Sequence, residues 1–121
     1  MIKEIDSETL KARHLAPQAT ATEPGNTNPN NDLLLVDIRS PEEVAQGAIP
    51  HAVHIPMHLL PLRIAELPRD RDLVLYCRSG ARSYHACQYL AHQGLDNAIN
   101  LRGGIIAWAR HGFPVGPLGA G

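Results

Sequence analysis

Apolar residues occur in short runs along the chain, and turn-forming residues separate these runs. The runs at 33–36 and 72–77 are almost continuous, which is typical of strands buried on both faces in the middle of a parallel sheet. Shorter apolar runs predict three further strands, at residues 2–5, 52–55 and 98–101. Five strands are therefore expected.

Helical patterns lie between the predicted strands. Ser40 and Glu43, with a proline at the first helical position, have the spacing of a capping box, and this helix is expected to end at Gly47. Ser7 is expected to cap a helix over residues 8–14. Apolar spacing predicts three more helices, at residues 58–67, 83–94 and 105–112.

Strands and helices alternate along the whole chain, which predicts an α/β fold. Right-handed crossovers give a three-layer domain, with a parallel sheet of about five strands and helices on both faces. The length of 121 residues predicts one domain, spanning residues 1–121. Asp37 and Cys77 end two predicted strands, and ligands bind such sheets beyond the carboxyl ends of the strands. Both residues are therefore expected at the functional edge.

Two segments lack a hydrophobic pattern. Residues 16–31 contain three prolines and four asparagines, and we expect a flexible insertion there. A loop of this length is unusual in so small a domain, and a partner-binding arm is the alternative interpretation. Residues 116–121 are expected to form a flexible tail.

The overall composition limits the function classes. The net charge is −1, and no apolar run reaches the roughly 18 residues of a membrane span, so neither nucleic acid nor a membrane is expected as a partner. The charged N-terminus lacks the apolar stretch of a secretory signal, which predicts a cytoplasmic protein. The two cysteines, Cys77 and Cys87, predict no disulfide framework, and both are expected as thiols.

The segment CRSGARS, from Cys77 to Ser83, contains the candidate chemistry. Cys77 ends a strand and Ser83 is expected to open a helix, so the backbone N–H groups between them can curve around the cysteine sulfur. Gly80 permits the backbone conformation that such a curve needs. The helix N-terminus and the charges of Arg78 and Arg82 favour the thiolate over the thiol. The pattern therefore predicts a nucleophilic cysteine at neutral pH.

The candidate residues also have purely structural interpretations. Cys77 could be a buried structural thiol, although its flanking residues argue against this. Cys87 falls inside a predicted helix and is expected to pack in the core, with resolution of an oxidised Cys77 as the alternative. Asp37 and Arg39 are expected to support the site as a structural cap and an ion-pair partner, and a direct catalytic role for Asp37 is the alternative. The seven histidines lack metal-ligand spacing, so no metal is predicted, and no cofactor-binding motif is present.

Three motifs, in order along the chain, resemble signatures of the rhodanese family. The first comprises Asp37-Ile38-Arg39, Ser40-Pro41-Glu42-Glu43 and Gly47-Ala48-Ile49-Pro50-His51-Ala52. The second resembles the family's active-site loop and reads Cys77-Arg78-Ser79-Gly80-Ala81-Arg82-Ser83. The third comprises Gly103-Gly104, Ala107-Trp108 and Gly112-Phe113-Pro114-Val115. The resemblance covers about residues 33–115. The chain differs from the family pattern in two places: Ala48 stands where family members usually have histidine, and the insertion at 16–31 is unusual.

The resemblance implies a sulfurtransferase with a rhodanese-like fold. Cys77 would be the catalytic residue, taking the outer sulfur of a donor such as thiosulfate as a persulfide and passing it to a nucleophilic acceptor. Residues 78–83 would form the substrate-binding loop, in which Arg78 and Arg82 steer the anionic donor. The covalent persulfide on Cys77 implies that no bound cofactor is needed. The acceptor would be cyanide in an assay and a thiol or protein in the cell. The resemblance does not identify the physiological donor and acceptor.

Two other functions fit part of the loop. Cysteine phosphatases and arsenate reductases also use a cysteine, a ring of amides and an arginine, but that arginine lies six positions after the cysteine. Ser83 occupies that position here and Arg82 comes one place earlier, which favours sulfur transfer. A persulfide carrier or docking module would keep the same cysteine, and the sequence does not separate it from an enzyme.

Overall fold

The computed structural model describes residues 2–14 and 33–117. The elements in chain order are β1 (Lys3–Ile5), α1 (Ser7–His14), β2 (Leu33–Asp37), α2 (Pro41–Ala45), β3 (Val53–His54), the 3-10 helix η1 (Met57–Leu59), α3 (Leu60–Arg63), the 3-10 helix η2 (Ile64–Glu66), β4 (Asp72–Tyr76), α4 (Ala81–His92), β5 (Ala98–Leu101) and α5 (Gly104–Arg110). The predicted insertion at 16–31 and residues 118–121 of the predicted tail lie outside the described residues. None of the described helices has the length and apolar composition needed to cross a bilayer.

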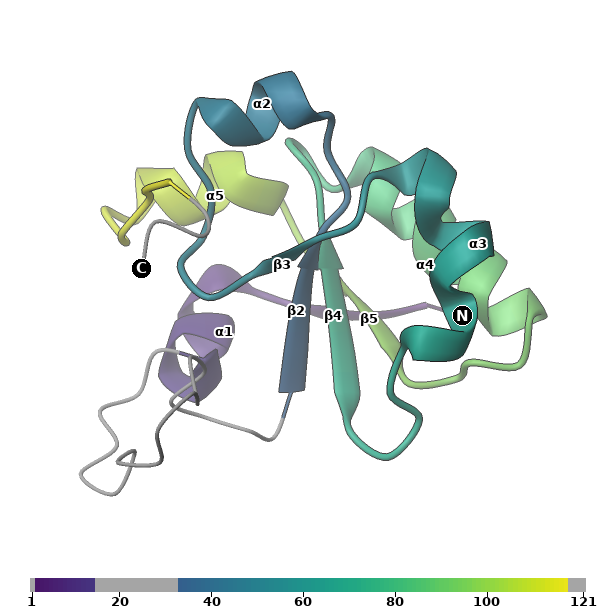
Figure 1. Ribbon diagram of the computed structural model, residues 1–121. Helices are drawn as coiled ribbons and strands as arrows, with labels where there is room; N and C mark the ends of the chain where they lie inside the picture. The colour runs from purple at the N-terminus through teal and green to yellow at the C-terminus, as the bar shows by residue number, and fades with distance from the viewer. Residues whose placement is uncertain (1, 15–32, 118–121) are drawn as a thin grey trace, which may run out of the picture.

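The five strands form one sheet in which all neighbouring pairs are parallel, in the order β1-β5-β4-β2-β3 (Figure 1). The predicted α/β fold is therefore confirmed. β4 lies at the centre of the sheet, between β5 and β2. The register places Asp37 beside Tyr76, so the carboxyl ends of β2 and β4 meet, and Cys77 follows directly.

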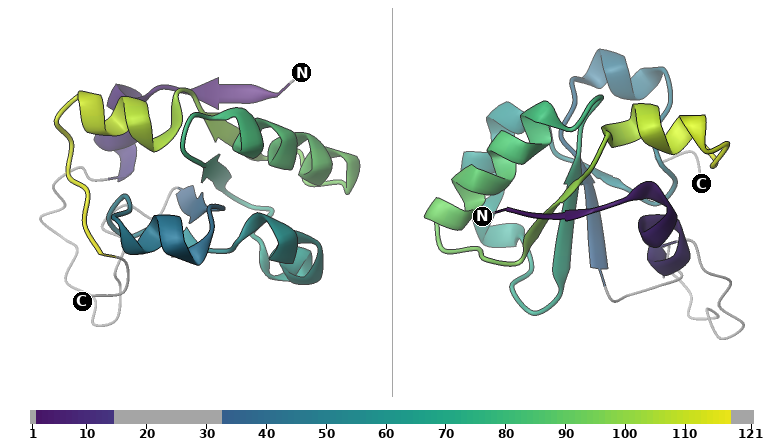
Figure 2. Two further views of the ribbon diagram at one scale, coloured as in Figure 1. Left: turned by 90° about the horizontal axis from the view of Figure 1, so that it is seen from above. Right: turned by 180° about the vertical axis from the view of Figure 1, so that it is seen from behind.

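Helices cover both faces of the sheet. Figures 1 and 2 show α1 and α5 on one face and α3 and α4 on the other. Alternate residues of a strand point to opposite faces, and the centre of the sheet follows this rule. Leu75 and Cys77 belong to the core under α4, whereas Val74 and Tyr76 share the opposite core with Trp108 of α5. The cysteine side chain therefore lies on the α4 side.

Helices α1, α4 and α5 each begin one or two residues earlier than predicted. Asp6, rather than Ser7, caps α1, because its carboxylate Oδ1 accepts the Thr9 N–H at 2.8 Å and Ser7 is already helical. The loop before α4 closes at Gly80, which has a φ of 101°, and the helix starts immediately afterwards. Ser83 therefore lies in the first turn of α4 rather than at its start.

The segment between β3 and β4 differs most from the prediction. Instead of one helix over 58–67, the chain forms η1, α3 and η2 in succession. Pro61 lies in the first turn of α3, where its missing N–H removes no helical hydrogen bond, but it cannot extend a preceding helix. The strand predicted at 52–55 is also shorter, Val53–His54.

The start of α2 agrees with the sequence. Ser40 Oγ accepts the Glu43 N–H at 3.3 Å, and Glu43 Oε1 accepts the Ser40 N–H at 3.2 Å, which confirms the capping box. Beyond this helix, Ala48 and Gly116 exchange backbone hydrogen bonds of 2.8 and 2.9 Å in an antiparallel bridge. The prediction that Gly116 belongs to a flexible tail is therefore wrong, because β-type pairing holds it against the segment after α2.

Candidate active site

Cys77 is the first residue after β4, the central strand, and starts the loop that leads into α4. This position is at the carboxyl edge of the sheet, where a parallel α/β fold places its ligands. The residue is only 1% exposed, so its sulfur lies at the bottom of the loop rather than on the surface. The contiguous loop from Cys77 to Ser83 thus lies at the edge that the sequence predicted.

Hydrogen-bond donors from the loop surround the sulfur. The Gly80 N–H lies 3.1 Å from Cys77 Sγ, and both the N–H and the hydroxyl of Ser83 lie at 3.5 Å. These donors come from the end of the loop and the first turn of α4, so the partial positive charge of a helix N-terminus is directed at the sulfur. Such an arrangement stabilises a sulfur that bears negative charge.

Two opposing effects set the pKa of Cys77. Burial on its own raises the pKa, since it disfavours the charged thiolate. Hydrogen bonds outweigh burial and lower the pKa below that of an ordinary cysteine: first from the Ser83 hydroxyl, then from the N–H groups of Ser83, Gly80 and Ser79. The loop therefore supplies the stabilisation mainly through hydrogen bonds, and less through the flanking arginines than the sequence suggested.

The start of α5 holds the loop from the other side. The N–H of Ile105 donates to the carbonyl of Cys77 at 3.0 Å, and the N–H of Ile106 donates to that of Arg78 at 3.1 Å. This close approach requires glycine at position 104, because a Cβ there would lie 2.6 Å from the Cys77 carbonyl oxygen. Gly104 also has a φ of 58°, which other residues resist. The sequence analysis included Gly103-Gly104 in the third motif without linking it to the cysteine.

Arg82 forms a two-pronged ion pair with Glu43 of α2. Its Nη1 and Nη2 atoms each lie 2.9 Å from a different carboxylate oxygen. The hydrogen bonds from Arg82 are the main reason that the pKa of Glu43 falls to about 2. Arg78 is exposed on the loop. The two arginines therefore differ: Arg78 faces solvent, whereas Arg82 already has a carboxylate partner.

Asp37 and Arg39 form a buried ion pair on the opposite side of the sheet from the Cys77 side chain. Asp37 is fully buried, and Arg39 donates to both of its carboxylate oxygens through Nε at 3.0 and 3.1 Å and through Nη2 at 2.6 Å. Arg39 Nη2 also donates to the Gly47 carbonyl at 2.7 Å. This geometry agrees with the supporting roles expected of both residues.

Asn100 is a polar residue of the site that the sequence analysis missed. It is 1% exposed in β5, and its Oδ1 lies 2.5 Å from Ser83 Oγ. Its Nδ2 donates to Glu4 Oε2 at 2.9 Å and to the Gly80 carbonyl at 3.3 Å. One signal was available, since asparagine interrupts the otherwise apolar strand AINL. A polar residue in a buried strand needs partners, and these lie at the cysteine loop.

Cys87, His54 and His14 lie outside the cysteine loop. Cys87 is fully buried in α4, and burial raises its pKa to about 12, which suppresses the thiolate. His54 Nε2 contacts the Arg39 carbonyl oxygen at 2.8 Å, and His14 Nε2 contacts that of Pro50 at 2.7 Å. Within residues 2–14 and 33–117, no group of three histidine, cysteine or carboxylate side chains is arranged to hold a metal ion.

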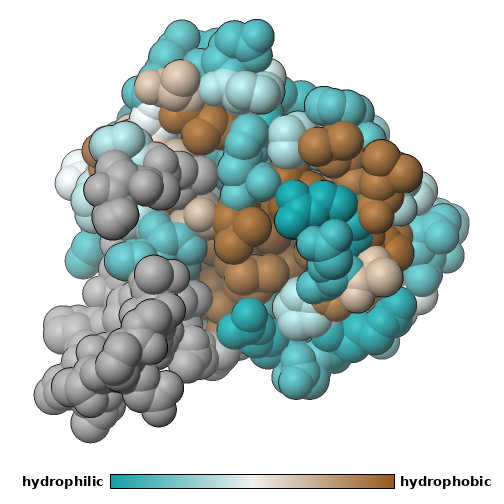
Figure 3. All heavy atoms as spheres, viewed as in Figure 1, coloured by the Kyte–Doolittle hydropathy of each residue, from teal (hydrophilic) through white to brown (hydrophobic). Residues whose placement is uncertain are grey.

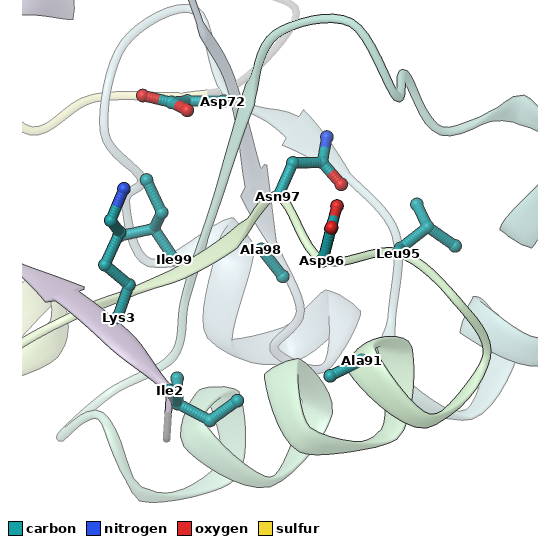
Figure 4. Close-up of a pocket in the computed structure, with 9 residues that line it drawn as sticks. All are labelled: Ile2, Lys3, Asp72, Ala91, Leu95, Asp96, Asn97, Ala98 and Ile99. Carbon is teal, nitrogen blue, oxygen red and sulfur yellow. The ribbon is translucent and has the colours of Figure 1, made fainter.

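Two surface hollows lie at different ends of the sheet. One hollow, of about 430 Å³, lies at the amino ends of the strands, and Figure 4 shows the residues that line it. Its lining residues are Ile2, Lys3, Asp72, Ala91, Leu95, Asp96, Asn97, Ala98 and Ile99. It contains no residue of the cysteine loop and lies at the wrong edge of the sheet for the cysteine chemistry. We therefore do not assign it to the active site.

The second hollow, of about 390 Å³, lies beside the loop. Its lining residues are Ile38, Arg39, Ser40, Pro41, Pro56, Met57, His58 and Arg82. Figure 3 shows hydrophobic surface on the face that includes β3 and α3, close to hydrophilic groups. An apolar hollow with a cation from the cysteine loop can accept a small anion or an apolar chain with an anionic end.

Comparisons with known proteins agree with this geometry. The model of the rhodanese-like domain family matches residues 20–111. A sulfurtransferase of Allochromatium vinosum is 57% identical over 115 residues, which cover 95% of each chain. The thiosulfate sulfurtransferase GlpE of Stutzerimonas stutzeri is 38% identical over 85 residues, or 70% of this chain and 77% of the relative.

A solved structure is also similar to this protein. The crystal structure of a rhodanese-like domain protein from Staphylococcus aureus matches with a TM-score of 0.69 and 30% sequence identity. The match covers 98% of this chain and 95% of that one. The chain belongs to the rhodanese-like domain family, and the resemblance found in its three motifs is confirmed. Sulfur transfer is the reaction named for both of these relatives, whereas two other relatives, 32% identical, are named tRNA uridine(34) hydroxylases.

Proposed function

We propose that the protein is a sulfurtransferase that holds sulfane sulfur as a persulfide on Cys77, with thiosulfate as one donor. The observation that carries the proposal is the ring of donors from Gly80 and Ser83 around a buried cysteine sulfur. The same donors that lower the pKa of the thiol can stabilise the negative charge on a terminal persulfide sulfur. The similarity to a thiosulfate sulfurtransferase supports the choice of donor.

The transfer would take place in two steps. The Cys77 thiolate attacks the outer sulfur of thiosulfate, an S–S bond forms, and the bond to the sulfonate sulfur breaks with its electron pair leaving on sulfite. An acceptor nucleophile then attacks the terminal persulfide sulfur and takes it, while the electron pair of the broken S–S bond returns to Cys77 as thiolate. Cyanide would give thiocyanate, and a thiolate would give a persulfide. The covalent intermediate divides one transfer into two easier steps.

Access to the sulfur favours this class of donor. Because Cys77 is only 1% exposed, a donor must present one protruding atom to the loop. Thiosulfate and persulfides have a terminal sulfur of this kind. The hollow beside the loop would hold the remainder of the donor or acceptor, and Arg82 and Arg78 would attract its negative charge.

A phosphatase would need a different arrangement. Phosphoryl transfer depends on donors directed at several phosphate oxygens and on an arginine that grips them. In this protein Arg82 binds Glu43 through both terminal nitrogens, so these two donors are not free to grip phosphate oxygens. We therefore expect negligible hydrolysis of an aryl phosphate. A persulfide carrier without rapid turnover would differ from an enzyme only in its rates.

Mass spectrometry tests the proposal directly. After incubation with thiosulfate, the intact protein should gain one sulfur atom, and peptide mapping should locate it on Cys77. Cys77→Ala and Cys77→Ser should abolish both this gain and the formation of thiocyanate from cyanide. Cys87→Ala is the matched control, since this buried thiol should leave most of the activity.

The outcomes separate the candidate functions. Sulfur on Cys77 with rapid thiocyanate formation identifies an enzyme, and sulfur on Cys77 with slow release identifies a carrier. Activity that survives in the Cys77 variants would exclude this cysteine as the nucleophile. Aryl phosphate hydrolysis without sulfur uptake from thiosulfate or a glutathione persulfide would favour a phosphatase.

A further inference from the structure

A chain of four side chains connects the edge strand β1 to the Cys77 sulfur. Asn100 Nδ2 donates to Glu4 Oε2 at 2.9 Å, Ser83 Oγ lies 2.5 Å from Asn100 Oδ1, and Ser83 Oγ lies 3.5 Å from Cys77 Sγ. Glu4 and Asn100 stand directly opposite each other in the β1–β5 register, which places their side chains on one face. All four side chains except that of Glu4, 32% exposed, are buried.

The Ser83 hydroxyl has one proton and three acceptors within reach. They are Asn100 Oδ1 at 2.5 Å, the Gly80 carbonyl oxygen at 3.3 Å and Cys77 Sγ at 3.5 Å. A hydroxyl donates to one acceptor at a time, so every proton given to Asn100 is withheld from the sulfur. The distances favour Asn100 in this competition, which weakens the Ser83 hydrogen bond that contributes most to lowering the Cys77 pKa.

Glu4 helps to determine which end of the Asn100 amide faces Ser83. A carboxylate only accepts hydrogen bonds, so the amide must turn Nδ2 toward Glu4 and its oxygen toward Ser83. The Gly80 carbonyl accepts from the same Nδ2 and selects the same orientation. Arg102, whose Nε lies 3.6 Å from Glu4 Oε1, helps to hold the carboxylate in place.

We propose that Glu4 and Asn100 are positioning residues that draw the Ser83 hydroxyl proton away from the Cys77 sulfur. They thereby limit how strongly Ser83 stabilises the thiolate. A thiolate that is stabilised less is a stronger nucleophile, because intrinsic nucleophilicity falls as the pKa falls. The inference concerns the ionisation of Cys77 and depends on the proposed function only for the reaction that this thiolate performs.

Other charged or titratable groups surround the cysteine and must be kept constant in a test. They are Arg78 on the loop, Arg82, His85 and Cys87 on α4, Glu43 on α2, Asp37 and Arg39 around the end of β2, and His58 on η1. Variants at position 4 keep these side chains, but they remove the ion-pair partner of Arg102 and a charge that, after burial, raises the pKa of Cys87, so the reaction must be followed on Cys77 alone. The first turn of α5 also adjoins the loop. The single ionisable side chain of α5, Arg110, lies at the other end of that helix.

A matched pair of variants separates hydrogen bonding from charge. Glu4→Gln removes the charge but keeps a side-chain oxygen that can accept from Asn100, whereas Glu4→Leu removes the acceptor as well. The probe is the rate at which iodoacetamide alkylates Cys77 as a function of pH, followed on the Cys77 peptide by mass spectrometry. Alkylation by this neutral reagent does not involve sulfur transfer, so the measurement remains valid even if the proposed function is wrong.

We expect Glu4→Leu to move the inflection of the pH profile to lower pH. Below the inflection, alkylation should be roughly threefold faster, because about tenfold more thiolate is partly offset by its lower nucleophilicity. Glu4→Gln should stay close to the unmodified protein. In a Ser83→Ala background, Glu4→Leu should have no effect, since no hydroxyl proton remains to be redirected.

Asn100→Leu provides a second variant of similar size, and it should shift the profile in the same direction as Glu4→Leu. Each variant is first checked for a cooperative thermal transition. Equal shifts in Glu4→Gln and Glu4→Leu would overturn the proposal in favour of a simple charge effect. A Glu4→Leu effect that persists without the Ser83 hydroxyl would overturn it as well.

Discussion

At the scale of single residues, the pairing of Arg82 with Glu43 determines how much positive charge the cysteine loop offers. Both guanidinium nitrogens that face Glu43 are engaged at 2.9 Å. An anionic donor that binds Arg82 must therefore compete with a carboxylate that belongs to the protein. Glu43 acts in this view as a determinant of donor affinity, although it lies outside the loop.

Glu43→Gln tests this role. Releasing Arg82 should lower the KM for thiosulfate severalfold while kcat changes little, because the change affects binding rather than the sulfur. Glu42→Gln is the matched control, as it removes the same charge from the same helix without touching Arg82. An unchanged KM in Glu43→Gln would argue against competition between the carboxylate and the donor.

The same substitution makes a prediction about stability and pH. The pKa of Glu43 is about 2 in the folded protein, against an ordinary value of 4.5, so the ion pair stabilises the fold above pH 4.5 and this contribution disappears as the pH falls through about 2. Because the pair is partly exposed, Glu43→Gln should cost only about 0.5–1 kcal/mol of unfolding free energy at pH 7. Urea denaturation at pH 7, 4 and 3 should show the difference shrinking, and a constant difference would contradict the assignment.

At the scale of elements, the cysteine loop depends on the helix that follows β5. The N–H groups of Ile105 and Ile106 hold the carbonyls of Cys77 and Arg78, which shapes the loop from below. The loop is thus held between the first turns of two helices, α4 on the side of the sulfur and α5 on the side of the carbonyls. Neither helix alone would define its conformation.

Gly104→Ala should therefore disrupt the site more than the fold. The new Cβ would lie 2.6 Å from the Cys77 carbonyl oxygen, so the loop must move, and we expect sulfur transfer to fall at least about tenfold. Gly112→Ala is the matched control, since Gly112 also has a positive φ, 76°, but nothing lies within 4 Å of a Cβ there. It should cost about 1 kcal/mol of stability and leave the rate unchanged. Similar losses of rate in both variants would refute a specific contact with the loop.

At the scale of the whole molecule, the Asp37–Arg39 pair joins β2 to the segment after α2. Arg39 bridges the Asp37 carboxylate and the Gly47 carbonyl at 2.7 Å, and the nearby Tyr76 hydroxyl accepts the Ile49 N–H at 3.0 Å. These buried contacts fasten the half of the molecule that carries α2 onto the central strands. The pair supports the site indirectly, by holding the helix that presents Glu43.

Removing one partner of this pair should destabilise the protein strongly. Asp37→Leu would leave the Arg39 guanidinium buried without its carboxylate, and we expect a loss of about 3–5 kcal/mol of unfolding free energy. The double variant Asp37→Leu with Arg39→Leu should lose less, because no uncompensated charge remains. Urea denaturation measures both, and a loss below about 1 kcal/mol in the single variant would show that the ion pair is dispensable.

The sequence alone determined the features that depend on neighbouring residues. The apolar runs located the two central strands, and the Ser40–Glu43 spacing predicted the start of α2. The loop from Cys77 to Ser83 was recognisable because its strand, cysteine, glycine and helix start are consecutive. Such features are stabilised by contacts within a few positions, so the local pattern contains the information that forms them.

Only the tertiary structure decided which distant residues complete the site. Arg82 and Glu43 are 39 positions apart, and Asn100 and Glu4 are 96 apart. Asn100 and Glu4 meet because the strand order β1-β5-β4-β2-β3 pairs β1 with β5, and β5 in turn lies beside the central strand β4. Hydrophobic periodicity shows that a strand is buried but not which strand lies next to it. The partners of the cysteine loop therefore follow from strand order and packing, which no local pattern specifies.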